Sequence, residues 1–289
     1  HINERQPYAS LYTSLGCPFK CSFCCINAPF GKSTIRHLSP ECVIKEIDIL
    51  VNRYSVKNIK IPDEMFVLHK KHVIDICDLI LERGYDLNIW AYARVDTVQD
   101  VFLEKLKNAG FNWLSLGIES GSEFVRNGAL KTLKSEDIAD TVRRIQSHDI
   151  NVCGNYIFGL PDDTQESMEQ TLQLSMELNT EWANFYCVMA YPGSPLHAFA
   201  RKEGISLPED YGGPGWIGYS QHAYETFPLR NKYLSQREIL KFRDESHTKY
   251  FSRVEYLDVI KKRFGEDTQK HVNEMNKIKL LRKYENIYS

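Results

Sequence analysis

The chain has 289 residues, 43% of them hydrophobic, and its 36 basic and 38 acidic residues give a formal net charge of -2. This length suffices for one sizeable core, and the balanced charge gives no indication of a nucleic-acid partner. The apolar runs are too short to span a bilayer, so we expect a soluble, cytoplasmic protein without a membrane partner. His1 stands in place of an initiator methionine and no signal peptide follows it, so the chain is expected to be either part of a longer protein or a processed form.

Short apolar segments alternate with amphipathic segments from residue 8 to about residue 200. The segments with strand character are 8–14, 57–62, 87–92, 113–118, 151–158 and 183–189. Such alternation predicts a parallel α/β sheet with right-handed crossovers, either open or curved into a partial barrel. In both architectures the ligands bind at the carboxyl ends of the strands.

The segments between the strands carry apolar residues at helical spacing. Four helices are expected, and their signals are a capped start at Ser39-Pro40, the face Val73, Ile76, Cys77 and Ile80 ended by Gly84, the face Phe102, Leu106 and Ala109 closed by Gly110, and the face Ile138, Val142 and Ile145 after Ser135. These helices would cover the sheet.

The pattern changes beyond residue 205. Residues 208–228 are rich in Gly, Pro and aromatics and predict a long ordered loop, in which Trp216 and Tyr219 either close a lid or pack the tail. Helices are expected at 235–252, 255–264 and 267–284, with Lys277, Lys279, Arg282 and Lys283 on a solvated face. We therefore divide the chain into a core barrel, 1–204, and an aromatic loop with a helical C-terminal extension, 205–289.

Four of the eight cysteines lie close together, at Cys17, Cys21, Cys24 and Cys25. Clustered thiols in a chain of this size indicate metal ligands rather than disulfides. The segment follows the first strand, so it belongs at the carboxyl edge of the sheet. A structural zinc site takes four ligands, usually in two separated pairs, and no second pair follows. Three close thiols suit an iron–sulfur cluster with one open corner, with zinc as the alternative.

The spacing C-x3-C-x2-C, with aromatic Phe23 before the last cysteine, resembles the signature of the radical S-adenosylmethionine (SAM) superfamily. The resemblance implies a partial (β/α)6 TIM-like barrel. It implies that Cys17, Cys21 and Cys24 ligate a [4Fe–4S] cluster whose fourth iron is chelated by SAM, with Phe23 near the adenine and Cys25 outside the cluster. Reductive cleavage of SAM to a 5′-deoxyadenosyl radical is the implied chemistry, with an electron donor such as flavodoxin or ferredoxin as partner.

Further segments resemble the SAM-binding elements of the same superfamily. By that resemblance, Asp63 and Glu64 after the second strand would bind the amino group of SAM. Arg94 after the third strand would lie near SAM, or else form an ion pair with Asp96. Glu119, in Gly117-Ile118-Glu119-Ser120-Gly121, would accept hydrogen bonds from SAM.

The two last strands end in segments that resemble adenine-binding elements. Gly159, Leu160 and Pro161 lie in a segment similar to G-x-I-x-G-x-x-E, in which Asp162 stands where the motif has Glu. Tyr191 and Pro192 begin a segment similar to P-G-[ST]-x-L. Both segments would offer their backbone to adenine.

Residues 7–17 and the Asp63-Glu64 and Glu119 segments resemble the cobalamin-dependent branch of the superfamily. The resemblance implies cobalamin as a further cofactor, a small-molecule or natural-product substrate, and methyl transfer as one reaction, with cyclisation or rearrangement as others. A cobalamin-binding domain would precede the barrel and is absent from this chain. Two alternatives remain: a cobalamin-independent enzyme such as a methylthiotransferase, and a non-catalytic iron–sulfur or zinc binding module.

Overall fold

The computed structural model describes residues 7–283 and confirms the predicted α/β class. Six parallel strands form a half-barrel in the order β1-β4-β5-β6-β7-β8. These strands are β1 (Tyr8–Ser10), β4 (Asn58–Ile61), β5 (Asn88–Arg94), β6 (Phe111–Glu119), β7 (Asn151–Phe158) and β8 (Trp182–Cys187). Of the two architectures that the strand–helix repeats allow, the chain has the partial TIM-like barrel that the resemblance implies.

The first strand is shorter than the sequence predicts. β1 ends at Ser10, and β2 (Ser14–Leu15) pairs antiparallel with β3 (Arg36–His37) in a separate two-stranded sheet. The chain leaves the barrel sheet because the backbone amide of Thr13 donates to the Asp63 side chain instead of to a neighbouring strand. Residues 16–35, which contain the clustered cysteines, therefore leave and return through the β2–β3 pair.

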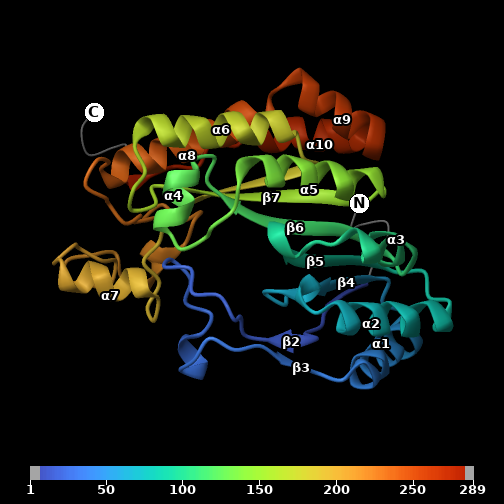
Figure 1. Ribbon diagram of the computed structural model, residues 1–289. Helices are drawn as coiled ribbons and strands as arrows, with labels where there is room; N and C mark the ends of the chain where they lie inside the picture. Colours follow the sequence, from blue (N-terminus) through green and yellow to red (C-terminus); the bar gives the residue numbers. More distant parts are fainter. Residues whose placement is uncertain (1–6, 284–289) are drawn as a thin grey trace. The chain divides into compact units, whose positions relative to one another are not determined.

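The chain divides into two units by its internal contacts, and each is described by itself. The first unit contains the residues up to Phe19, Lys32–Ile118 and Glu136–Gly154. In it, α1 (Pro40–Tyr54), α2 (Lys70–Arg83) and α3 (Asp100–Asn108) lie side by side (Figure 1). Most of α5 (Ser135–Ser147) also belongs to this unit.

The helix signals of the first unit act as predicted. The Ser39 hydroxyl accepts a hydrogen bond from the amide of Cys42, and Pro40 occupies the first turn of α1. Gly84 ends α2 in the left-handed conformation that glycine adopts without strain. The buried apolar faces of these helices supply the core beside the strands.

The second unit contains Lys20–Gly31, Glu119–Ser135 and the described residues from Asn155 onward. Its helices are α4 (Glu123–Gly128), α6 (Gln165–Leu178), α7 (Pro195–Lys202), α8 (Gln236–Phe251), α9 (Val254–Phe264) and α10 (Glu266–Lys277). Ser235 and Glu238 form a capping box that starts α8. The helical C-terminal extension is thus confirmed.

The end of the extension differs from the prediction. α10 ends at Lys277 and not at residue 284, which lies outside the described residues. Arg282 is not on a solvated face, since only 1% of it is exposed. Its guanidinium forms an ion pair with Asp244 at 2.8 Å and also donates to the Thr226 hydroxyl at 2.7 Å. The helix ends early because this buried arginine anchors an extended tail.

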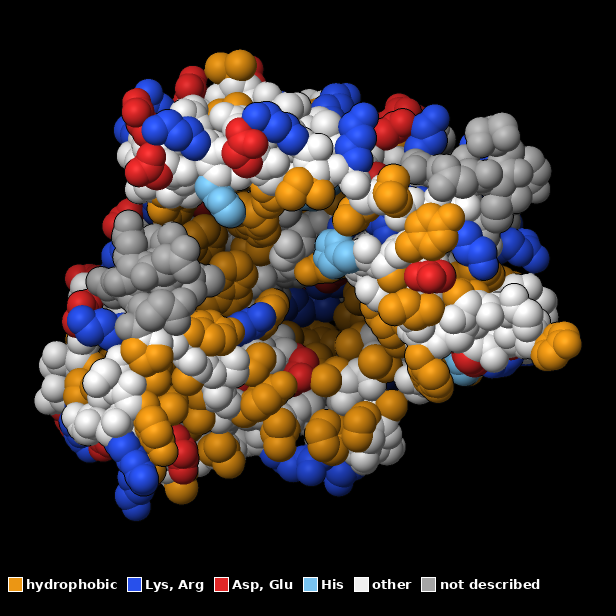
Figure 2. All heavy atoms as spheres, turned by 180° about the vertical axis from the view of Figure 1, so that it is seen from behind, with side chains coloured by type: hydrophobic (Ala, Val, Ile, Leu, Met, Phe, Trp, Pro, Cys, Tyr) orange, Lys and Arg blue, Asp and Glu red, His pale blue; other side chains and the backbone are white. Residues whose placement is uncertain are grey.

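Charged side chains of both signs lie on the face that Figure 2 shows. On the face shown in Figure 2, the Lys and Arg side chains lie interspersed with Asp and Glu, in keeping with the net charge of -2. Among residues 7–283, none of the helices is both long enough and apolar enough to cross a membrane.

Candidate active site

The clustered cysteines are accessible, in contrast to the cysteines of the core. Cys17 and Cys21 are partly exposed, and Cys24 is exposed. Cys77, Cys153 and Cys187 are buried, and burial raises the pKa of each thiol to about 12. The three core thiols are therefore poorly suited to bind a metal, whereas Cys17, Cys21 and Cys24 are accessible to one.

The donor set of the loop fits an iron–sulfur cluster, which is held by cysteine thiolates. The boundary between the two units falls between Cys17 and Cys21. Within the described part of the chain, no group of three or more His, Cys, Asp or Glu side chains is arranged so that it could hold a metal ion. The chemistry of the thiols, and not a preformed geometry, is what matches the cluster.

Asp63 lies just after β4 and is completely buried. Its Oδ1 accepts a hydrogen bond from the Thr13 amide at 2.8 Å. Its Oδ2 accepts from the hydroxyls of Thr13 at 2.5 Å and Ser14 at 2.7 Å. Burial raises the pKa of Asp63, while these hydrogen bonds lower it. The carboxylate is thus occupied by the residues that lead into the cysteine loop.

Three histidines, His37, His69 and His72, lie next to the contact between Thr13 and Asp63. His72 Nε2 is 3.2 Å from Thr13 Oγ1, and the His37 ring lies 4.5 Å from the rings of both His69 and His72. Burial lowers the pKa of His72 to about 4, so the ring is neutral near pH 7. Because the Thr13 hydroxyl donates its proton to Asp63, the network assigns the His72 proton to Nε2, which donates to Thr13.

Glu64 is oriented differently from its neighbour Asp63. The backbone amide of Gly16 stabilises its carboxylate, which lowers the pKa, but burial and the charge of Asp63 raise it more. Its Oε2 atom is buried and has no hydrogen-bond partner among the described residues. A buried carboxylate oxygen without a donor favours a cationic ligand at this position.

Arg94, at the end of β5, is buried. Its guanidinium lies 4.3 Å from the ring centre of Phe19, and its Nε donates to Asp96 Oδ1 at 2.7 Å. The predicted ion pair with Asp96 is therefore present, but Arg94 itself is only 5% exposed. The stacking on Phe19 connects β5 to the cysteine loop two residues after Cys17.

Glu119 is the last residue of β6 and belongs to the second unit. Its backbone φ is 69°, a value that residues other than glycine rarely adopt. Its carboxylate is nearly buried and forms an ion pair with Lys131, which is also buried. Non-glycine residues in this region of φ concentrate at functional sites because the surrounding structure must hold them there. Lys131 therefore already pairs with the Glu119 carboxylate, and the SAM-binding role of Glu119 stays a prediction.

The residues after Glu119 explain the glycine of this motif. The Thr171 hydroxyl lies 3.1 Å from Ser120 Oγ and accepts from the Gly121 amide at 2.8 Å. A Cβ atom at Gly121 would lie 2.5 Å from the carbonyl oxygen of Gln170. Arg126 is completely buried and donates to the Ser120 carbonyl at 2.6 Å. Glycine is therefore needed for the close approach of this turn to α6.

The turn after β7 is built around Asp163. This buried carboxylate accepts from the amides of Gly159 at 2.9 Å and Leu160 at 3.0 Å, and from the Ser167 hydroxyl at 2.5 Å. Gly159 has a φ of 86°, which favours glycine. Burial raises the pKa of Asp163 to about 6 against these hydrogen bonds. The sequence motif pointed to Asp162, but Asp163 is the acid that shapes the turn.

The Tyr191-Pro192 segment and the aromatic loop, 208–228, contact each other within the second unit. Tyr191 stacks on Tyr219 with ring centres 5.5 Å apart, so this residue of the aromatic loop packs on the predicted adenine segment, whereas Trp216 is 71% exposed. A Cβ atom at Gly193, directly after Pro192, would lie 2.5 Å from the Ala28 side chain. The cysteine loop therefore approaches the backbone of this segment closely.

Phe23 packs against an apolar cluster of the second unit and is partly buried there. The cluster consists of Val125, Ala129, Leu160, Val188, Ala190, Leu196, Ala200, Leu207 and Leu229. The amide of Ser22 donates to the Ala129 carbonyl, and the Ser22 carbonyl accepts from the Leu196 amide. These contacts hold the Cys21–Cys24 part of the loop within its unit.

Comparison with known protein families shows that one family pattern covers most of these segments. A family model of the radical SAM superfamily matches residues 11–175, more than half of the chain. The chain belongs to the radical SAM superfamily. Members of this superfamily use a [4Fe–4S] cluster and SAM.

Three individual proteins illustrate the radical SAM likeness. An uncharacterized methyltransferase of Pyrococcus horikoshii, PH0819, is 33% identical over 201 residues, which are 70% of this chain and 44% of that protein. The solved structure of TsrM, a radical SAM methyltransferase from Kitasatospora setae, matches with a TM-score of 0.63 and 21% identity over 71% of this chain and 41% of that one. OxsB, a cobalamin-dependent SAM radical enzyme, matches with a TM-score of 0.63 and 17% identity over 92% and 44%.

These figures set the scope of the likeness. The two solved structures show that the fold is shared. The chain spans less than half the length of each of the three proteins. The activity and substrate of the whole protein are therefore treated below as proposals.

The sequence motifs of the radical SAM core missed several residues of the site. Thr13 and Ser14 were seen only as a lead-in to Cys17, and Lys131 and Asp163 were not singled out. A signal existed for Asp163, since a carboxylate four residues after a glycine turn and before a helix favours local amide bonds. For Lys131 the sequence carries no signal, because its partner Glu119 lies 12 residues earlier in the chain.

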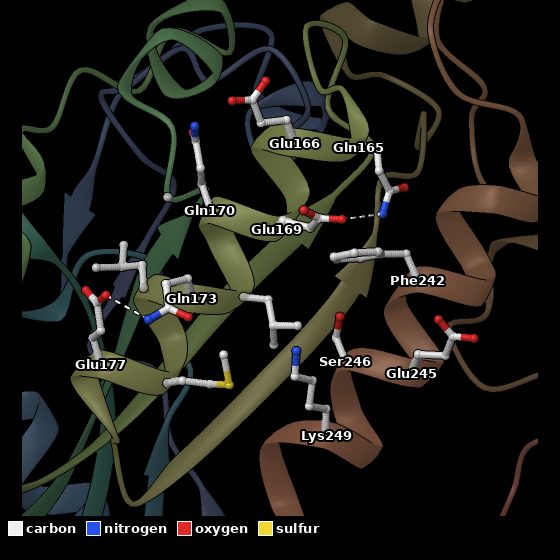
Figure 3. Close-up of a pocket in the computed structure, with 14 residues that line it drawn as sticks. Gln165, Glu166, Glu169, Gln170, Gln173, Glu177, Phe242, Glu245, Ser246 and Lys249 are labelled. Atoms are coloured by element: carbon white, nitrogen blue, oxygen red, sulfur yellow. Dashed lines mark hydrogen bonds between the residues drawn. The ribbon is translucent and has the colours of Figure 1, made fainter.

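A groove of about 790 Å³ lies between α6 and α8 in the second unit. Figure 3 shows that it is lined mainly by polar side chains, in which Gln165 and Gln173 donate to Glu169 and Glu177 one helical turn further on. None of the predicted cysteine or SAM-binding residues lines it. This groove touches the radical SAM elements only at Gly121, which follows the Glu119 segment.

Proposed function

We propose that the protein is a radical SAM enzyme that modifies a small molecule, with methyl transfer as its reaction. One observation carries the proposal: the family match at 11–175 spans the cysteine segment, the acids and glycines at the ends of β4, β6 and β7, and Arg94 at the end of β5. A plain metal-binding module would need the thiols but not Glu64, Glu119 and the Gly159 turn. Methyl transfer is supported by the names of PH0819 and TsrM.

Cys17, Cys21 and Cys24 are proposed to hold the [4Fe–4S] cluster, with Cys25 outside it. When bound, the cluster supplies the electron that cleaves SAM to methionine and a 5′-deoxyadenosyl radical. Three protein ligands leave one position open for the amino and carboxylate groups of SAM. A reducing compartment is required to keep the thiols as ligands, so we place the protein in the cytoplasm with flavodoxin or ferredoxin as electron donor.

The residues of the chain bind and orient SAM in this proposal. Glu64 would provide a carboxylate for the amino group, and its Oε2 is the atom best prepared for it, because it is buried without a donor among the described residues. Glu119 would accept hydrogen bonds from SAM. The tight turn at Gly159–Pro161 and the Tyr191-Pro192 segment would offer backbone groups to adenine. The stacked Tyr191–Tyr219 pair makes the second of these segments rigid.

Cobalamin is proposed as a second cofactor, as the likeness of the fold to OxsB suggests. It would carry the methyl group to an unreactive carbon. The natural substrate is proposed to be a small molecule, the class that the tryptophan substrate of TsrM represents. We assign residues 1–204 to the SAM barrel and 205–289 to the extension of this enzyme.

Anaerobic reconstitution with iron, sulfide, SAM and a reductant tests the enzyme proposal. We expect a brown protein that releases 5′-deoxyadenosine. Replacing Cys17, Cys21 or Cys24 by Ala should abolish both the colour and the product, while Cys25→Ala, a change in the same loop, should retain them. A colourless protein that binds zinc and does not cleave SAM would support the non-catalytic module instead.

SAM labelled in its methyl group distinguishes the reactions. With added cobalamin, transfer of the label to cobalamin and then to a product would support methyl transfer. Label transfer together with sulfur, independent of cobalamin, would support a methylthiotransferase. If the radical forms but the label stays in methionine, the reaction is a cyclisation or rearrangement.

A further inference from the structure

We propose that Asp63 is a positioning residue that holds the Cys17 side of the cysteine loop, and that it does not bind SAM. Together with Thr13, Ser14 and His72 it forms what we name the neck clamp. The inference rests on the proposed function, because it assigns the clamp to the loop that would carry the cluster. It also divides the Asp63-Glu64 pair into a structural acid and a ligand-binding acid.

The first argument is the geometry of the loop neck. Residues 16–35 emerge between β2 and β3, which are joined through only two residue pairs, Ser14 with His37 and Leu15 with Arg36. The Leu38 amide adds one hydrogen bond to the Thr13 carbonyl at 2.8 Å. Two-stranded ribbons of this length are marginally stable in water. The neck therefore needs further contacts to stay in place.

The second argument is that the Asp63 carboxylate is closed to SAM. Its two oxygens already accept one amide and two hydroxyl hydrogen bonds, and none of the residue is exposed. An ammonium group would have to enter a closed site and displace donors from the residues before Cys17. Glu64, by contrast, keeps a buried Oε2 without a hydrogen-bond partner among residues 7–283.

The third argument is the hydrogen-bond chain behind the acid. Neutral His72 donates to Thr13 Oγ1, which donates to Asp63 Oδ2. Thr13 is itself completely buried, so each group in this chain has one defined role. A fully satisfied buried network favours one conformation of the chain that carries it.

The fourth argument is that Cys17 is bracketed on both sides. The neck clamp holds residues 13 and 14, and the Gly16 amide donates to Glu64. Arg94 stacks on Phe19 at 4.3 Å on the other side. All these contacts lie within the first unit. They place Cys17 before any cluster binds, which lowers the entropic cost of assembling the site.

Two matched pairs of variants test the clamp. Thr13→Val removes the hydroxyl at nearly constant shape, and Thr13→Ser retains it. Asp63→Asn replaces one acceptor oxygen by an NH2 group, which cannot accept the hydrogen bonds that the Thr13 and Ser14 hydroxyls donate. Glu64→Gln removes the charge but retains an oxygen that accepts from the Gly16 amide. Asp267→Asn, at the exposed start of α10, controls for a general Asp→Asn effect.

The first readout uses the metal-free protein. Hydrogen exchange of a peptide that spans residues 11–19 should be faster by ~10-fold or more in Thr13→Val and Asp63→Asn than in Thr13→Ser and Glu64→Gln. Alkylation of Cys17 should accelerate in parallel. If exchange in this peptide is the same in all variants, the clamp does not exist.

The second readout uses the reconstituted protein. We expect Glu64→Gln to keep the full iron content and the electron paramagnetic resonance (EPR) signal of the reduced cluster, but to raise the Kd of SAM by about 10-fold. Asp63→Asn and Thr13→Val should instead lower the iron content and broaden that signal. If Asp63→Asn keeps the cluster and only weakens SAM binding, Asp63 is a SAM ligand and the proposal is wrong.

The two readouts separate this inference from the proposed function. A wild-type protein that forms no cluster would overturn the proposed function, while hydrogen exchange would still decide whether the clamp holds the loop. A wild-type protein that cleaves SAM, with no difference between Thr13→Val and Thr13→Ser in either readout, would overturn the clamp alone. If Asp63→Asn does not fold, the Thr13 pair still decides.

Discussion

The turn after β4 and the turn after β7 are organised by the same kind of group. Asp63 and Asp163 are both completely buried, and each accepts three hydrogen bonds from backbone amides and hydroxyls. They differ in the distance along the chain to their donors. The donors of Asp163 lie within four residues, and those of Asp63 lie about 50 residues away.

This difference in sequence separation determines what each acid does. Asp163 shapes a local turn that begins α6, which it would do in any chain with the same few residues. Asp63 connects the end of one strand to the neck of a loop that leaves another strand. The first contact builds an element, whereas the second positions one element relative to another.

The largest expected effect is the loss of either acid. Asp163→Ala leaves two buried amides without an acceptor and the Ser167 hydroxyl with only the more distant Thr164 carbonyl, which should lower the free energy of unfolding by about 3 kcal/mol. Asp63→Ala should cost a similar amount for the same reason. Urea denaturation of both variants measures this. A loss below ~1 kcal/mol for either one would show that its donors find new partners, and the two turns would no longer be equivalent.

An effect of intermediate size is expected from pH on the free energy of unfolding, because His72 contacts the Thr13 hydroxyl that donates to Asp63. The pKa of His72 falls to about 4 in the folded protein, so between pH 6.5 and 4 the unfolded chain binds more protons. Stability supplied by neutral His72 is therefore complete above about pH 6.5 and decreases as the pH falls. Relative to His72→Gln, which keeps the donor but does not titrate, the wild type should lose on the order of 2–3 kcal/mol across this window.

Unfolding curves of both proteins at several pH values check this expectation. Other groups that titrate in the same window, such as Asp163, are common to the two proteins and cancel in the difference. Parallel pH profiles would mean that His72 is protonated without consequence for the fold. The hydrogen-bond chain to Asp63 would then be weaker than its geometry indicates.

The smallest effect sharpens the comparison most. Ser14→Ala and Ser167→Ala each remove one hydroxyl from a buried aspartate, and each should cost about 1 kcal/mol. The two variants should differ in which part of the backbone becomes more mobile. Hydrogen exchange should increase near Cys17 in Ser14→Ala, and only around the start of α6 in Ser167→Ala. Equal exchange near Cys17 in both variants would remove the special role of the Asp63 side.

Much of the fold could be predicted because its signals are local. The strand–helix alternation, the Ser39-Pro40 start of α1 and the Gly84 end of α2 each depend on a few neighbouring residues. The glycines of the site also carry local information, as the φ of 86° at Gly159 shows. The early end of α10 was missed because it depends on Arg282 reaching Asp244, 38 residues away in the chain.

The sequence by itself determined the chemistry of the site: three spaced thiols after a strand and acids after the strands that follow, in the order of a radical SAM core. It did not determine which acid does what, since Asp63 and Glu64 are adjacent and chemically alike. Only the tertiary structure distinguishes their surroundings, because it buries Asp63 among Thr13 and Ser14 and leaves Glu64 Oε2 without a donor among the described residues. Burial and hydrogen bonding depend on residues that are distant in the chain, and that information appears only once the chain has folded.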